Sequence, residues 1–221
     1  MKKSEFLVAL VVLVLASQQS LAAHVCNFAE GEDRWSIKTS VPNGALDQTV
    51  QEIDLESLID STNPTLSKQQ KTAIANRRWS GRLAASDKSG NHISLKEGDM
   101  ISVEGFLYRA RCQKDGDYHL EIGTTDKKGS PCLIVEAPDP DQVADSALKA
   151  RVTDVRSMLD SLDPGIFTGS SKTIAVAVKV TGQFFLDAHH IGSGDPGGGR
   201  GTKHCATNVW EIHSVTAIEA Q

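Results

Sequence analysis

The alternation of apolar and polar positions predicts strands in the C-terminal half of the chain. The run from Met100 to Cys112 is long and rich in β-branched and aromatic residues, and Asp115-Gly116 after it is a strong hairpin signal. Over residues 117–122 polar and apolar residues alternate one by one, which is typical of a strand with one buried face. Later runs have the same character, so we expect strands at residues 100–112, 117–122, 132–137, 173–186 and 207–218.

One segment between the third and fourth of these strands has the period of a helix instead. Apolar residues recur every three or four positions over residues 144–162. Asp139 or Asp141 would cap the first turn, and Pro164-Gly165 would end the helix. The predicted order is therefore β-β-β-α-β-β, mainly β with one long helix, which is the order of an OB-like Greek-key barrel.

The barrel is expected to occupy residues 98–221, after an N-terminal extension at residues 23–97. The extension is irregular and partly helical, with a helical turn predicted at residues 55–59. Ser67 predicts the cap of a second helix, from Lys68 to about Arg78. Because the extension holds little core material, we expect it to pack on the barrel rather than to form an independent catalytic unit.

Residues 1–22 have the pattern of a secretory signal peptide. Lys2 and Lys3 form a positive start, residues 6–16 are apolar, and Ser20-Leu21-Ala22 offers small residues for cleavage. The apolar run is short for a membrane span, so a retained anchor is the less favoured alternative. No later segment is apolar enough to cross a membrane. We therefore expect bacterial export to the periplasm or to the outside of the cell.

The mature chain is mildly acidic, which bears on its partners. Cleavage removes Lys2, Lys3 and Glu5 and leaves 21 basic and 27 acidic residues, a net charge of −6. Non-specific nucleic-acid binding depends on neutralising phosphates, so the composition gives no strong nucleic-acid signal. Basic residues do gather on the first predicted strand, at Arg109 and Arg111.

Four cysteines follow the signal peptide, namely Cys26, Cys112, Cys132 and Cys205. An even number in an exported chain favours two disulfides, and all three pairings remain open. A zinc site that uses cysteines is the alternative, but no two of them have the CxxC spacing that is typical of such sites.

Three short acid-x-histidine triplets carry the candidate chemistry of the chain. They are Asp117-Tyr118-His119, Asp187-Ala188-His189 and Glu211-Ile212-His213, and His190 directly follows the second. In an extended strand residues i and i+2 point to the same face, so each triplet would place its carboxylate beside its own imidazole. In an OB-like layout the first two triplets adjoin the loops that flank the usual ligand surface, and the third lies below them.

Four segments form a series, GDYHLEI at 116–122, LIVEAPDP at 133–140, VKVTGQFFLDAHH at 178–190 and NVWEIHSVTAI at 208–218. The series resembles a group of uncharacterised secreted bacterial proteins. Their pattern is a D-x-H-L strand, a short IVE-P-P strand, a V-T-G-x-x-F-F-D-x-x-H segment and a closing E-L-H-P-V strand. The resemblance covers residues 98–221, with Ser214 in place of the usual proline. It implies no activity, but it singles out Asp117, His119, Asp187, His190 and the triplet Glu211–His213.

These residues allow three kinds of role. Imidazoles with carboxylates suit a divalent metal such as zinc, manganese or iron, which could generate hydroxide for hydrolysis of a phosphodiester or similar bond. The same groups could instead form a buried, satisfied polar network, or act as acid–base pairs without metal. The network is the commoner outcome for such pairs.

We therefore expect an exported OB-like binding or accessory module whose ligand is small or oligomeric and of unknown identity. The alternative is a metal-dependent hydrolase with the triplet residues and His190 as ligands or bases, so the sequence leaves open whether the protein is an enzyme. A third hypothesis is that the extension docks a protein partner in the cell envelope, which exposed apolar residues near Ile74 would favour.

Overall fold

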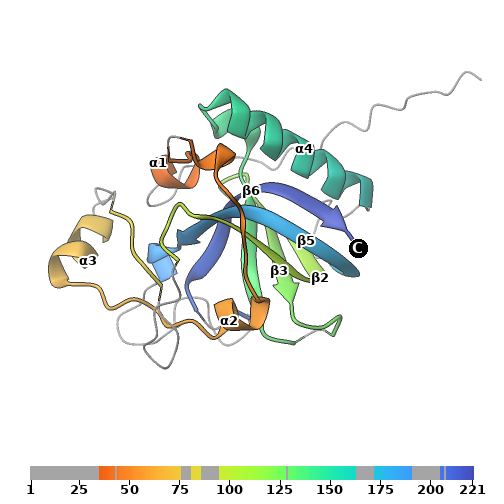
Figure 1. The fold of residues 1–221 in the computed structure, drawn as a ribbon, viewed down its shortest axis with the longest axis horizontal. Coiled ribbons are helices and arrows are strands. Elements are labelled where there is room, and N and C mark those ends of the chain that lie inside the picture. The colour runs from red at the N-terminus through yellow and green to blue at the C-terminus, as the bar shows by residue number, and fades with distance from the viewer. Residues whose placement is uncertain are drawn as a thin grey trace, which may run out of the picture.

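Five strands form a closed barrel, and a further strand of two residues pairs with the first of them (Figure 1). The strands are β1 (Gln51–Glu52), β2 (Met100–Cys112), β3 (Tyr118–Gly123), β4 (Cys132–Ala137), β5 (Lys172–Leu186) and β6 (Trp210–Ala220). The structure is a computed structural model, and it describes residues 35–42, 44–75, 81–85, 95–127, 129–162, 172–190, 205–206 and 208–221.

The strand order confirms the predicted OB-like barrel. The sheet runs β1-β2-β3-β4-β6-β5, and pairing of β5 with β2 closes it. Most neighbouring strands are antiparallel, whereas β4 and β6 are parallel. A parallel pair needs a crossover connection, and the chain between these strands holds both α4 (Ser146–Leu162) and β5. The long helix thus stands between the third and fourth barrel strands, as the sequence predicts.

The structure describes four short helices before the barrel. They are α1 (Trp35–Lys38), η1 (Ala45–Asp47), α2 (Leu55–Ile59) and α3 (Lys68–Ala75). Of these, α3 begins at the residue that its capping signal indicates. Ser67 and Gln70 form a capping box, in which each side chain accepts a hydrogen bond from the other residue's backbone N–H, at 3.2 and 2.8 Å. Arg78, at the predicted end of α3, lies outside the described residues, as does Pro164-Gly165 after α4.

The predicted cap of α4 is wrong. Asp139 caps only a short 3₁₀ turn, η2 (Pro140–Gln142), and the backbone is extended again at Val143. The carboxylate that caps α4 belongs to Asp145, which accepts the backbone N–H of Leu148 at 2.7 Å. The apolar period begins at Ala144, two residues before α4, so the pattern alone placed the helix start too early.

The interior of the barrel is filled by the apolar face of each strand. In β3 this face consists of Tyr118, Leu120 and Ile122, all fully buried. Phe184 of β5 stacks on Trp210 of β6 with ring centroids 4.6 Å apart. The extension contributes to the same core through Leu55, Leu58, Ile59 and Leu66. Within the described residues, no helix combines the length and the apolar character that a membrane span requires.

The helix α4 lies along the barrel beside β6 and supports the turn between β2 and β3 (Figure 1). Its buried Arg156 lies over the ring of Tyr118, 3.7 Å from the centroid, and donates to the carbonyl of Gly116 at 3.1 Å. Asp160 accepts a hydrogen bond from the Tyr118 hydroxyl at 3.2 Å. These contacts position the turn that leads into Asp117.

Candidate functional site

The acid and histidine residues of β3, β4 and β6 lie on the outer face of the barrel wall, because the alternate apolar positions face the interior. Residues on neighbouring strands meet in register, His119 opposite Glu136 and Glu136 opposite His213. The three side chains therefore form a row across three strands. Asp117, directly before β3, lies beside this row and contacts His213.

Hydrogen bonds join these residues across the strands. His119 Nδ1 lies 2.6 Å from Glu136 Oε1, and His213 Nε2 lies 3.1 Å from Asp117 Oδ2 and 3.5 Å from Glu136 Oε2. Asp117 and His213 are 0% exposed. Asp117 and His119 therefore each have a hydrogen-bond partner on another strand.

A lysine from the extension supplies the positive charge at this site. Lys38, the last residue of α1, is 5% exposed. Its Nζ lies 3.4 Å from Glu136 Oε2, 3.7 Å from Asp115 Oδ2 and 3.9 Å from Asp117 Oδ2. We refer to Lys38, Asp115, Asp117, His119, Glu136 and His213 as the Lys38 cluster.

Two hydrogen bonds hold the backbone after α1 against β5 and β6. The Ser214 hydroxyl donates to the carbonyl of Lys38 at 2.8 Å, and the Gln183 amide donates to the carbonyl of Ser40 at 2.9 Å. Sequence reasoning missed Lys38, since it stands in the extension, outside every motif. It also missed Glu136, although the IVE segment of the resemblance contains it.

The charges of the cluster shift the pKa values of its members in different directions. Burial alone would lower the pKa of Lys38, but Glu136, Asp117, Glu211 and Asp187 together raise it well above its usual value. Burial would likewise raise the pKa of Glu136, yet Lys38 and the hydrogen bond from His119 hold it well below the usual range. The site thus holds an ammonium ion and an ionised carboxylate in contact.

Asp115 behaves differently from Glu136. Burial and the neighbouring charge of Asp117 raise its pKa to about 6, and Lys38 offsets only part of this. Unlike Glu136, Asp115 is therefore harder to ionise here than in water.

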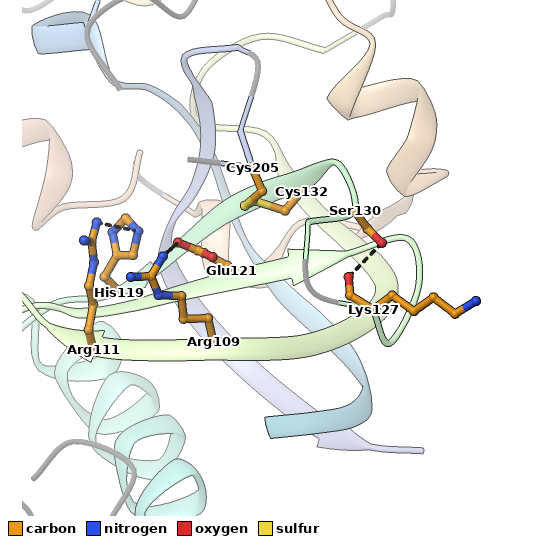
Figure 2. Close-up of a disulfide and its surroundings, with 8 residues drawn as sticks. All are labelled: Arg109, Arg111, His119, Glu121, Lys127, Ser130, Cys132 and Cys205. Atoms are coloured by element: carbon orange, nitrogen blue, oxygen red, sulfur yellow. Dashed lines mark hydrogen bonds and ion pairs between the residues drawn. A yellow bond between two sulfur atoms is a disulfide. The ribbon is translucent and has the colours of Figure 1, made fainter. Parts of the chain in front are cut away.

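His119 is contacted at both ring nitrogens. Arg111 Nη2 lies 3.2 Å from His119 Nε2 (Figure 2). On the other side, Nδ1 lies 3.0 Å from Nε2 of Gln113 and 2.6 Å from Oε1 of Glu136. His119 thus stands between the arginine of β2 and the carboxylate of β4.

The second triplet lies at the end of β5 and in η3 (Ala188–His190). Asp187 pairs with Nδ1 of His190, the histidine three residues on that the resemblance singles out. The side chain of His189 lies outside what the structure describes. The charges of Asp187 and Glu211 both contribute to the raised pKa of Lys38.

Two groups of side chains have the spacing of metal ligands. One is Asp117, Glu136 and His213, whose ligand atoms lie within 4.8 Å of one another. The other contains Glu121, Cys132 and Cys205, but the two cysteines form a disulfide (Figure 2) and offer no thiolate. Cys112 is also disulfide-bonded, and no described cysteine is free. Cys26 lies outside the described residues.

Comparison with known proteins adds no assignment. No family model matches the chain, and no curated protein matches it at a significant level. The resemblance to secreted bacterial proteins therefore remains a prediction from the quoted segments.

Proposed function

We propose that the protein is an exported binding or accessory module that binds an anionic ligand on the outer face of β2 and β3. The observation that carries this proposal is a pair of arginines on this wall. Arg109 and Arg111 are two residues apart on β2 and project from the same face (Figure 2). In OB-folds the second and third barrel strands and the loops beside them form the usual ligand surface. Here these strands are β3 and β4, so the arginines of β2 lie beside that surface.

Both arginines are partly exposed and held in place from one side. Arg109 Nη1 lies 3.2 Å from Oε1 of the buried Glu121, and the Arg109 side chain is 31% exposed. Arg111 Nη2 lies at the same distance, 3.2 Å, from Nε2 of His119. A guanidinium group presents five N–H donors in a planar fork that matches carboxylates and phosphates. Two oriented forks on one wall favour a ligand with repeated anionic groups.

The hydrolase alternative is less well supported by the geometry. A catalytic metal keeps one coordination position open to water or substrate. In the described part of the chain, Asp117, Glu136 and His213 are buried, and the Lys38 ammonium lies among them. This arrangement supports a structural role for the triplets better than a catalytic one.

Export to the periplasm or to the outside of the cell is part of the proposal. The disulfide between Cys132 and Cys205 supports it, because such bonds persist in oxidising compartments. It joins β4 to a segment 73 residues further along the chain.

The test is binding of two anionic oligomers, inorganic polyphosphate and the carboxylate polysaccharide alginate, measured by calorimetry at two salt concentrations. Arg109→Gln should weaken binding about tenfold or more, the equivalent of one charge-assisted hydrogen bond. Arg151→Gln, on the exposed face of α4, is the matched control and should leave affinity unchanged. Absence of binding to either oligomer, or equal affinity of both variants, would contradict the proposal.

A further inference from the structure

The spacing of Asp117, Glu136 and His213 matches that of a metal site. Two neighbouring ligands of a tetrahedral zinc ion are about 3.4 Å apart, given metal–ligand distances near 2.1 Å. His213 Nε2 lies 3.1 and 3.5 Å from the nearest oxygens of Asp117 and Glu136. One imidazole with two carboxylates is also a donor set that suits zinc.

A second observation is a buried oxygen that lacks a hydrogen bond. Asp117 Oδ1 has no hydrogen-bond partner among the described residues, and the Asp117 side chain is fully buried. A buried carboxylate oxygen without a donor is costly, so such atoms are rare in folded proteins. This oxygen belongs to the same carboxylate that binds His213, and a cation there would satisfy it.

The Lys38 ammonium occupies this place without close contacts. Charge-assisted N–H···O bonds are typically about 2.8 Å long. Lys38 Nζ is 3.4, 3.7 and 3.9 Å from the oxygens of Glu136, Asp115 and Asp117. A single positive charge thus faces three carboxylates at distances longer than a good hydrogen bond. A divalent ion would offer twice the charge at a shorter distance.

We propose that Asp117, Glu136 and His213 form a divalent-metal site that Lys38 closes, so that metal binding and docking of α1 exclude each other. The ammonium and the metal would share the same oxygens, and both cannot bind there at once. The hydrogen bonds from Ser214 and Gln183 to the backbone carbonyls of Lys38 and Ser40 join α1 to the barrel. In the proposal, displacement of the buried Lys38 side chain weakens this docking. The metal would therefore change the surface of the barrel. This inference is independent of the anionic ligand proposed above.

The first test removes the competing ammonium. Lys38→Met replaces the lysine with an unbranched, uncharged side chain of similar length. Equilibrium dialysis against Zn²⁺, followed by elemental analysis, measures the bound metal. We expect one zinc per chain, bound about 10- to 100-fold more tightly than by the wild-type protein, the usual range for coupled sites. The double variant Lys38→Met/Asp117→Asn should lose this gain. Equal zinc affinity of Lys38→Met and wild type would overturn the proposal.

The second test uses the wild-type protein, so it holds even where Lys38→Met fails to fold. An amine-acetylating reagent should modify Lys38 slowly while it is buried, and mass spectrometry reads the modification residue by residue. Saturating Zn²⁺ should speed acetylation of Lys38 about tenfold or more. Lys149, whose side chain is 44% exposed, is the internal control and should react at an unchanged rate. Zinc binding with Lys38 still protected would refute mutual exclusion.

Discussion

Glu136 is the carboxylate on which the Lys38 cluster depends most, so Glu136→Gln should be strongly destabilising. Its side chain accepts a hydrogen bond from His119 at 2.6 Å and lies 3.4 Å from Lys38 Nζ. Glutamine has nearly the same shape and keeps one acceptor oxygen. The substitution therefore removes the charge of Glu136. The buried ammonium of Lys38 is left with Asp115 and Asp117, whose oxygens lie farther away, at 3.7 and 3.9 Å.

The magnitude follows from the distances. Two unit charges 3.4 Å apart attract by about 5 kcal/mol at an effective dielectric constant of about 20. A hydrogen bond to a charged group adds about 1.5–3 kcal/mol. Glutamine avoids part of the desolvation cost that Glu136 bears, which offsets some of this loss. We expect a net loss of about 3–5 kcal/mol, the range seen when one partner of a buried ion pair is removed.

Urea unfolding at pH 7 measures this loss, with Asp115→Asn as the matched control. Asp115 belongs to the same cluster and lies 3.7 Å from Lys38 Nζ, but its raised pKa means that its charge is unfavourable there. Asp115→Asn should change the free energy of unfolding by less than about 1 kcal/mol, or increase it. A loss below about 1 kcal/mol in Glu136→Gln, or equal losses in both variants, would refute the reasoning.

Three further predictions concern pH, helix docking and the disulfide. Because burial raises the pKa of Asp115 to about 6 in the folded state, against about 3.9 in the unfolded state, folded Asp115 holds more of its proton between these values, and its own contribution to stability should fall as pH rises through them. Thermal unfolding from pH 4 to 7 should show a smaller fall in Asp115→Asn. Arg156→Met should cost about 2–4 kcal/mol in urea unfolding, since a buried carbonyl loses its donor, whereas Lys149→Met on the same helix should cost less than about 0.5 kcal/mol. Replacing Cys132 and Cys205 by serine should cost about 2–4 kcal/mol in the same assay, through the large loop that their disulfide closes.

Local pattern was sufficient for most of the barrel. The predicted strands at 100–112 and 132–137 coincide with β2 and β4, because β-branched and apolar residues and the turns beside them are encoded in neighbouring residues. The last strand begins at Trp210 rather than at Thr207. Strand order followed from the order of elements, since an OB-like barrel is one of few ways to close five such strands around one helix.

The composition of the site could not be predicted in the same way. Lys38 reaches the cluster only because α1 docks on β5 and β6, a contact between residues more than 140 positions apart. Glu136 occupies an outward position in the strand CLIVEA, which reads as a continuous apolar run. The described partners of Lys38 and Glu136 lie far from them in sequence, so no local pattern indicates the role of either residue.

The geometry of a strand explains why Asp117, His119 and His213 have partners on other strands. Residues i and i+2 are about 6.7 Å apart along a strand, whereas directly opposed side chains on neighbouring strands have Cβ atoms about 5 Å apart. His119 therefore meets Glu136, and Asp117 reaches His213. The same argument holds for any triplet of this kind in a sheet: its carboxylate indicates which face is polar, and the neighbouring strand supplies the partner. Here that rule collects more carboxylates than imidazoles, and the excess negative charge requires a cation, which Lys38 provides in this structure.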